Sequence, residues 1–402
     1  MSPSRARVRA GGGAGTGRPG TATARRRPPG VRHPSTMAAR TGRRSVPWTT
    51  VVPVAALLVL AVTWGRHAGA VLIVLVGACL AGAVLAAVHH AEVVAHRVGE
   101  PFGSLVLAVA VTVIEVALIV TLMVSSASDT ASLARDTVFA AVMITCNGIV
   151  GLSLLLGALH GRVAVFNAEG TGTALATVST LAALCLVLPT FTTSSPGASF
   201  SGPQLAFAAV ASVALYGLFV LIQTVRHRDY FLPVAHPGVP EHDDEHADPP
   251  SDRVALWSLG LLLVALVAVV GLAKIESKPI EDGVKAAGFP ASAVGVIIAL
   301  LVLLPETLAA VRAARRGRVQ TSLNLGLGSA MASIGLTIPA IAVASIWLEG
   351  PLELGLGATQ IVLLAITVAV GTLTVVPGRA TLQQGGVHLV LFGAFLFLAI
   401  NP

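Results

Sequence analysis

The chain contains eleven apolar runs, most of them long enough to cross a lipid bilayer as a helix. They lie at approximately 49–65, 69–90, 103–124, 137–159, 172–190, 204–224, 254–273, 292–312, 322–347, 354–376 and 386–400. Charged residues make up only 11% of the 402 residues, whereas soluble domains carry about 25%. Because only helices and closed barrels satisfy the backbone inside a bilayer, the pattern predicts an all-α polytopic membrane protein with about 11 transmembrane helices.

Two hydrophilic segments divide these runs. Residues 1–48 contain eleven arginines and no acidic residue, so we expect a disordered cytoplasmic tail. Residues 225–253 are rich in proline, histidine and acidic side chains and are expected to form a cytoplasmic linker. The run at 49–65 then becomes an extra transmembrane helix ahead of two five-helix blocks, 69–224 and 254–400.

Loop charges predict the orientation. The turn after the run at 292–312 contains four arginines and is expected on the cytoplasmic side. Counting helices back from this turn places the N-terminus inside, and it places the loop with Asp129 and Asp136 outside. By the same count, the stretch 274–285, which carries both lysines and acids, becomes an external loop.

Two glutamates lie inside apolar runs, one in each five-helix block. Glu115 lies in GSLVLAVAVTVIEVALIVTLM and Glu306 in ASAVGVIIALLVLLPETLAAV. A carboxylate at this depth is energetically expensive, so an intramembrane acid usually faces a polar cavity and has a function. Because each block has an odd number of helices, the second is inverted relative to the first. The two acids are therefore expected near the midplane, where inverted repeats meet.

The runs that follow the two glutamates contain small polar residues in matching positions. Aligned at these residues, ITCNGIVGLSLLLGA and GLGSAMASIGLTIPA place Asn147 opposite Ser329 and Gly151 opposite Ser333. The side chains expected to supply oxygen ligands beside the carboxylates are Asn147, Ser329, Ser333 and Thr112. The positions expected to interrupt a helix and expose backbone carbonyls are Pro305, Gly148, Gly151 and Gly328.

This set of residues predicts a cation site. Hard cations such as Ca2+ bind several oxygen ligands, preferably including carboxylates. Glu115 and Glu306 supply the negative charge and are the predicted metal ligands. Desolvation and mutual repulsion favour the protonated form of neighbouring carboxyl groups, so protons compete for the same site. Such competition predicts a secondary antiporter that exchanges a cation for protons by alternating access.

The residue pattern also bears on two other classes of protein. A cation channel would show a continuous polar ring or filter and would need no titratable carrier; it remains the alternative from a different class. An intramembrane enzyme would need a nucleophile with a base, or a histidine-rich metal triad, within the apolar runs. Neither pattern occurs, and HAEVVAH at 90–96 is not the HExxH motif of metalloproteases. The chain is therefore not expected to be an enzyme.

Two long stretches, 99–120 and 303–340, resemble the signature repeats of bacterial Ca2+/H+ antiporters of the calcium/cation antiporter superfamily. They read GEPFGSLVLAVAVTVIEVALIV and LLPETLAAVRAARRGRVQTSLNLGLGSAMASIGLTIPA. The resemblance implies an eleven-helix protein of the bacterial inner membrane, with two inverted five-helix repeats plus one extra N-terminal helix. It implies Glu115 and Glu306 as the carriers of cation and protons. It implies no cofactor, and as partners only inorganic cations, protons and the bilayer, without nucleic acid.

The residues near Glu115 bear on the choice of cation. Vacuolar-type relatives carry Gly-Asn-x-x-Glu, whereas Val111-Thr112 stand in the corresponding place here. In this respect the chain is similar to the bacterial branch of the superfamily, whose members exchange Na+ or K+ as well as Ca2+. Extrusion of Ca2+ in exchange for H+ is the preferred interpretation, with Na+/H+ or K+/H+ antiport on the same site as the alternative. Gly151, where sodium/calcium exchangers usually have Asn, disfavours coupling of Ca2+ to Na+.

Two polar clusters outside the apolar runs are candidate cytoplasmic sensors of pH or metal. Histidine titrates near neutral pH, and mixed carboxylates and imidazoles bind metals. The first cluster, at the end of the second run, comprises His89, His90, Glu92 and His96. The second, in the hydrophilic linker, comprises Glu241, His242, Asp243, Asp244, Glu245 and His246. A solvated helix end and a solvated linker are the simpler interpretations.

Overall fold

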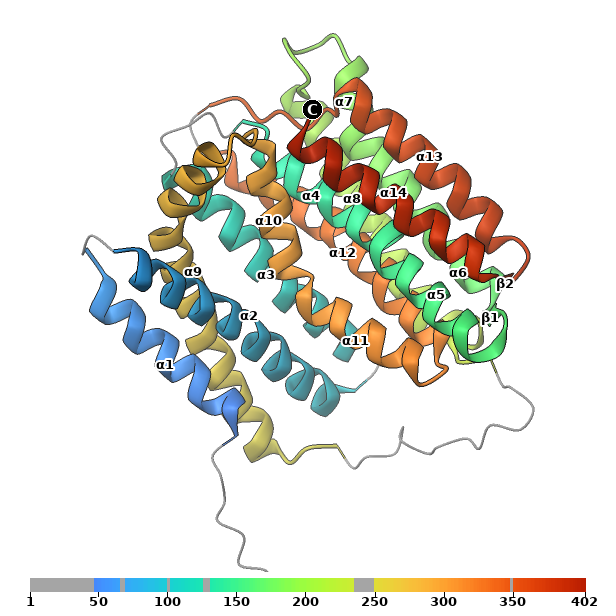
Figure 1. The fold of residues 1–402 in the computed structure, drawn as a ribbon, viewed down its shortest axis with the longest axis horizontal. Helices are drawn as coiled ribbons and strands as arrows, with labels where there is room; N and C mark the ends of the chain where they lie inside the picture. The colour runs from blue at the N-terminus through green and yellow to red at the C-terminus, as the bar shows by residue number, and fades with distance from the viewer. Residues whose placement is uncertain (1–46, 66–68, 100–101, 126–130, 235–248, 348–349) are drawn as a thin grey trace, which may run out of the picture. The chain divides into compact units, whose positions relative to one another are not determined.

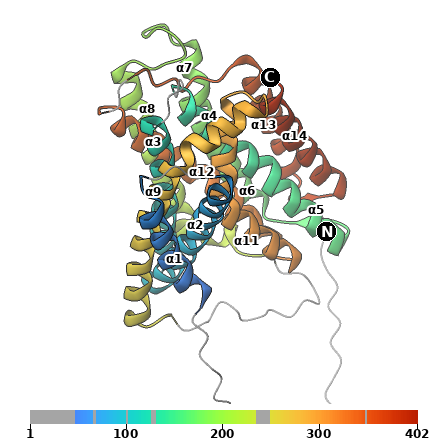
Figure 2. The ribbon, with the colours of Figure 1, turned by 60° about the vertical axis from the view of Figure 1, so that its left-hand side comes forward.

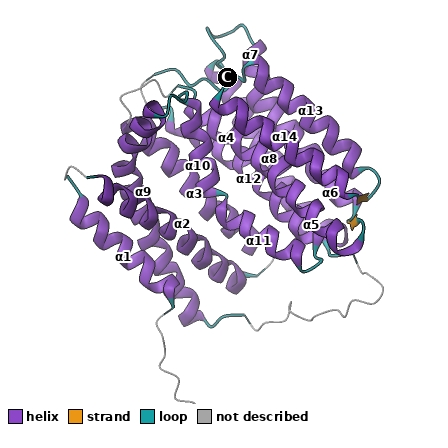
Figure 3. Ribbon diagram, viewed as in Figure 1, coloured by secondary structure: helices purple, strands orange, loops and turns teal. Residues whose placement is uncertain are grey.

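Helices make up most of the chain that the structure describes (Figures 1 and 3). The computed structural model describes residues 47–65, 69–99, 102–125, 131–234, 249–347 and 350–402. Residues 1–46 of the arginine-rich segment lie outside the described residues, as does the linker cluster from Glu241 to His246.

The first five-helix block begins after a separate N-terminal helix and is interrupted by π-helical turns. Its elements, with that first helix included, are α1 (Trp48–Thr63), α2 (Ala70–Val98), α3 (Phe102–Ser125), α4 (Leu133–Met143), η1 (Ile144–Ile149), α5 (Val150–Gly161), β1 (Ala164–Val165), α6 (Ala168–Ala182), η2 (Ala183–Val187), α7 (Leu188–Phe191), α8 (Gly202–Leu221), η3 (Ile222–Arg226) and η4 (Arg228–Phe231). The helices α4 and α5 form one span through η1, and α6 and α7 form another through η2.

The second block repeats the order of spans, but its irregularity is a sharp bend in its second span, whereas the first block has π-helical turns in its third, fourth and fifth spans. The elements of the second block are α9 (Asp252–Ala286), α10 (Ser292–Val302), α11 (Leu304–Arg315), α12 (Val319–Ala344), α13 (Ala358–Val375), β2 (Arg379–Ala380) and α14 (Leu382–Ile400). The pair α10 and α11 is bent by 52° at Leu303.

The predicted membrane class is confirmed. Within the described residues, nine helical spans are long and apolar enough to cross a bilayer, and the bent pair α10–α11 makes a tenth. The helix α1 is equally apolar but has only 16 residues. Large apolar side chains also cover outer faces of the bundle: Val71 is 86% exposed, Leu373 73% and Trp347 75%. Such an apolar surface is unfavourable in water and favourable in contact with lipid.

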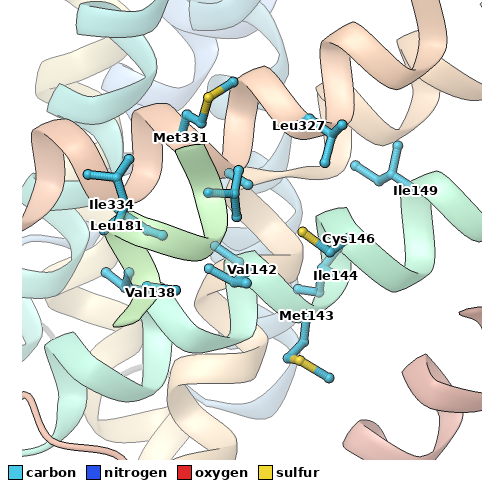
Figure 4. Close-up of a cluster of buried hydrophobic side chains, with 14 of the residues drawn as sticks. Val138, Val142, Met143, Ile144, Cys146, Ile149, Leu181, Leu327, Met331 and Ile334 are labelled. Carbon is cyan, nitrogen blue, oxygen red and sulfur yellow. The ribbon is translucent and has the colours of Figure 1, made fainter. Parts of the chain in front are cut away.

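The helices pack into two groups that meet along α3, α10 and α12. In one group, α1, α2 and α9 lie side by side, as both views show (Figures 1 and 2). In the other group, α12 lies among α4, α6 and α8. Figure 4 shows this core: Val138 and Val142 of α4 lie near Met331 and Ile334 of α12. The contact between α3 and α12 therefore joins the two groups and the two blocks.

Two glycines allow α12 to approach its neighbours closely. A Cβ atom at Gly335 would lie 2.8 Å from Tyr216 Cβ on α8, and one at Gly326 would lie 3.0 Å from Ile149 Cγ2 on η1. The small residues of this segment thus serve helix packing, which in lipid depends on close backbone approach.

The predicted helix interruptions are only partly where the sequence placed them. The bend at Leu303 lies two residues before Pro305, and Gly148 lies in the π-helical turn η1. However, α12 runs without interruption through Gly328, and Gly151 lies inside α5. Those two predictions are wrong, because a single glycine weakens a helix by only about 1 kcal/mol, which is too little to interrupt a long apolar helix.

The prediction that 274–285 forms a loop is also wrong, since α9 continues as a helix to Ala286. Its inner face stays buried, with Glu276 5% and Glu281 7% exposed. Lys278 and Asp282 pair on the outer face, with Nζ and Oδ2 3.2 Å apart. A further departure from an all-helical chain is a two-residue antiparallel pairing of β1 with β2, in which Ala164 lies opposite Ala380.

Candidate functional site

Glu115 lies in the middle of α3 and is fixed by two hydroxyl groups of α12. Its side chain is 4% exposed. Ser333 Oγ donates a hydrogen bond to Glu115 Oε1 at 2.5 Å, and Thr337 Oγ1 donates one to Oε2 at 2.9 Å. Ser333 and Thr337 are four residues apart, so both hydroxyls lie on the same face of α12. Each oxygen of a carboxylate buried in the apolar interior thus has a donor.

A small cavity opens beside Glu115. Its volume is about 10 Å³, close to the space that a single water needs. It is lined by Val111, Thr112, Glu115, Ala141, Ala299, Val302, Leu303, Ser329, Ala332 and Ser333. These residues come from both blocks, and four of the residues predicted from sequence are among them: Glu115, Thr112, Ser329 and Ser333. The cavity can therefore offer a small cation several oxygen atoms.

Glu306 lies in the first turn of α11, just after the bend. Leu303, three residues earlier, lines the cavity, but Glu306 itself is not among the lining residues. The unpaired N–H groups of a first helical turn favour a negative charge there. Glu306 Oε2 is buried and has no hydrogen-bond partner among the described residues. Glu306 lies within electrostatic reach of Glu115 and of Glu92.

The two inversion-related acids are thus held differently. The repeat alignment places Gly151 opposite Ser333, and α5, which carries Gly151, packs against α11. A glycine offers no hydroxyl, and a side chain at Gly151 would in any case meet His388 and Leu389 of α14. Among the described residues, Glu306 Oε2 therefore has no counterpart of the donor that Ser333 provides for Glu115. A buried oxygen without a donor is costly unless a proton or a cation occupies it. Glu306 Oε2 is therefore an oxygen at which a proton or a cation can bind.

Asn147 is not brought to the cavity beside Glu115. Its Nδ2 donates to Thr367 Oγ1 at 2.9 Å, and its Oδ1 lies 3.2 Å from His388 Nδ1. The other ring nitrogen of His388 lies 3.2 Å from Thr374 Oγ1. This network was missed from sequence, where the only signal was a single histidine inside the last apolar run. It borders a second, mainly apolar cavity of about 20 Å³.

The histidine-rich end of α2 does not form a single cluster. His90 is buried, and its Nε2 lies 2.9 Å from the carbonyl oxygen of Thr49, which joins α2 to α1. His89 is half-buried, whereas Glu92 and His96 are exposed. Among the residues that the structure describes, no three His, Cys, Asp or Glu side chains are placed together to hold a metal.

A helical membrane protein with an acid inside a membrane span of each of two blocks, and with polar groups of both blocks around one cavity, has the architecture of a cation exchanger. The family model described as sodium/calcium exchanger protein matches residues 68–225 and 257–401. The chain therefore belongs to this family of the calcium/cation antiporter superfamily, whose members are secondary transporters built from two repeats rather than enzymes.

Three bacterial proteins are similar along much of their length. The protein named "Putative ionic transporter y4hA" of Sinorhizobium fredii is 45% identical over 88% of this chain and 96% of its own. The sodium-potassium/proton antiporter ChaA of Escherichia coli is 34% identical over 86% of this chain and 94% of its own. The Ca(2+)/H(+) antiporter of Aphanothece halophytica is 24% identical over 67% of this chain and 76% of its own.

Two solved structures share the fold. Native YfkE superposes with a TM-score of 0.66 at 14% sequence identity, over 88% of this chain and all of that one. The H+/Ca2+ exchanger CAX gives a TM-score of 0.64 at 16% identity, over 87% of this chain and 86% of that one. At these low sequence identities, the similarity shows a shared arrangement of helices.

Proposed function

We propose that this protein is a cation/proton antiporter in which Glu115 and Glu306 bind either the cation or protons. The observation that carries the proposal is the buried Glu115 beside a small cavity that also bears hydroxyl groups. On the neighbouring bent helix, an oxygen of Glu306 has no hydrogen-bond partner in the part of the chain that the structure describes. Protons and cations compete for the same carboxylate oxygens. An empty, doubly charged site is too costly to carry across the membrane, so only the loaded forms change sides.

For the cation, we favour Na+ or K+ and keep Ca2+ as the second candidate. The relative that is 34% identical is named a sodium-potassium/proton antiporter. Ca2+ takes six to eight oxygen ligands, whereas few polar side chains line the cavity beside Glu115 and the Asn147 amide bonds elsewhere. In support of Ca2+, two carboxylates balance a divalent charge, and the relative at 24% identity is named a Ca(2+)/H(+) antiporter.

We further propose an inner-membrane location with the N-terminus in the cytoplasm. Successive spans run in opposite directions, so the ends of α2, α5 and α11 lie on one side of the bundle (Figure 1). Arg97, Arg162 and Arg315 mark these ends, and Arg97 also pairs with Asp252 at the start of α9. The opposite side carries lysines that are balanced by acids. Arginine-rich turns favour the cytoplasm, and the 69–224 and 254–400 blocks then have opposite orientations.

The experiment measures proton movement in everted membrane vesicles. A pH gradient is imposed, and Na+, K+ or Ca2+ is added in turn to dissipate it. Glu115→Gln and Glu306→Gln should each abolish coupled exchange while the protein remains folded in the membrane. Glu169→Gln, at an exposed glutamate of α6, is the matched control and should exchange normally. Coupled exchange in both single variants would refute the proposal, and cation flux without proton movement would indicate a channel.

A further inference from the structure

The first helices of the two blocks carry an acid in the same position. Both α2 and α9 are followed by a glycine with positive φ, Gly99 at 76° and Gly288 at 75°. Such a backbone ends a helix and is readily adopted only by glycine. Glu92 lies seven residues before Gly99, and Glu281 lies seven residues before Gly288. Because the blocks are inverted, these two acids lie toward opposite faces of the membrane.

Equivalent positions in the two blocks nevertheless differ in exposure. Glu92 is exposed, whereas Glu281 is 7% exposed. Glu281 Oε1 is buried without a hydrogen-bond partner among the described residues, and Oε2 lies 4.0 Å from Lys285 Nζ. The acid on α2 is thus exposed where its counterpart on α9 is buried. A transporter that alternates between two faces has this asymmetry in each of its end states.

Each of these helices packs against the helix that carries an intramembrane glutamate. The helix α2 contacts α11, and Glu92 lies within electrostatic reach of Glu306. The helix α9 contacts α3, which carries Glu115. The inversion that relates the two blocks also relates the contact of α2 with α11 to the contact of α9 with α3. Glu276 also lies buried on α9, but its counterpart on α2 is Ala87, so Glu276 has no equivalent in the first block.

We infer that Glu92 and Glu281 are equivalent access carboxylates, one for each face, that transfer the transported cation between solution and the deep pair Glu115 and Glu306. The structure is then the inward-facing form, with Glu92 open to the cytoplasm and Glu281 closed. This inference rests on the proposed function and orientation. A carboxylate at the mouth of a narrow path raises the local concentration of cations and speeds their capture.

The test measures the half-saturating cation concentration separately at each face, with Na+, K+ and Ca2+ as the probes. Everted vesicles present the cytoplasmic face to the medium, and right-side-out vesicles present the external face. Glu92→Gln should raise the half-saturating concentration about tenfold in everted vesicles and leave it unchanged in right-side-out vesicles. Glu281→Gln should give the opposite pattern.

Substitutions at two exposed acids serve as matched controls. Asp282→Asn changes the residue next to Glu281, and Glu169→Gln changes an acid on the proposed cytoplasmic side. Neither control should change either value. Equal shifts at both faces, no shift at either face, or the same shift in Asp282→Asn would overturn the inference. If the Glu281→Gln variant does not accumulate in the membrane, the Glu281→Asp variant is measured in its place. A carboxylate shortened by one methylene should raise only the external value, and an unchanged value would overturn the role of Glu281.

Failure of the inference about Glu92 and Glu281 can be distinguished from failure of the proposed function. If Glu115→Gln and Glu306→Gln both retain coupled exchange, the proposed function falls, whatever the outer acids do. If those variants are inactive while Glu92→Gln and Glu281→Gln behave normally at both faces, only the role of the outer acids is lost.

Discussion

Ser333 on α12 donates a hydrogen bond to Glu115 on α3, with 2.5 Å between Oγ and Oε1. These residues are 218 positions apart in the chain and belong to different blocks. The bond ties the conformation of a candidate cation carrier to the contact between the blocks. Any movement of one block against the other must therefore alter the ligands around Glu115.

Ser333→Ala should weaken cation binding without unfolding the protein. Hydrogen bonds to a charged group contribute about 1.5–3 kcal/mol, and they favour the ionised carboxylate that a cation needs. We expect the half-saturating cation concentration to rise by roughly tenfold or more. Ser333→Thr keeps the hydroxyl and is the control. Equal exchange kinetics in the alanine variant and the native protein would show that the bond is irrelevant to transport.

Pro305→Ala should slow exchange while leaving stability unchanged or higher. Pro305 lies in the first turn of α11, where the missing N–H has no helical partner to lose, and its substitution restores the N–H that a continuous α10–α11 helix would need. A straighter helix would redirect Glu306 in the first turn of α11. Exchange rate and thermal unfolding in detergent are the measurements. Pro53→Ala, at the proline inside α1, is the matched control. The interpretation fails if Pro305→Ala transports at the native rate.

Gly335→Val should destabilise the protein, because its Cβ would meet Tyr216 at 2.8 Å in the contact between α12 and α8. Overpacking of this kind costs about 1–3 kcal/mol and should lower the unfolding temperature. Gly328→Ala in the same helix has no neighbouring atom within 4 Å and should leave stability unchanged or slightly higher. If Gly328→Ala impaired exchange instead, α12 would need a hinge there after all.

Asn147→Ala should lower stability and leave the order of cation preference unchanged. The substitution leaves Thr367 and His388 without their amide partner inside the bundle, at a cost of about 1–3 kcal/mol. Thermal unfolding and competition among Na+, K+ and Ca2+ are the two readouts. A changed cation preference would instead assign Asn147 to the transport site, as the repeat alignment suggested.

The sequence by itself was sufficient for the membrane class, the succession of spans and the two unusual acids. Apolar runs of bilayer length leave the backbone one solution, a helix, so α2 or α12 needed no tertiary information. A charge such as Glu115 in such a run stands out because its desolvation is so unfavourable. The site pairing of Glu115 with Ser333 was partly accessible, since inverted repeats bring matching helices together.

Only the tertiary structure decided which polar groups meet. Asn147 and Ser329 align in the repeats, yet Ser329 lines the cavity beside Glu115 while Asn147 bonds to Thr367. Gly328 and Gly326 look alike in sequence, but only Gly326 faces a close neighbour. The charges of the stretch 274–285 predict a loop, although packing of its apolar side chains Ile275, Ile280 and Val284 against the core keeps it helical. Periodicity and composition report what a segment can bury. They carry no information about the partner on the other side of the contact, which depends on how helices far apart in the chain pack.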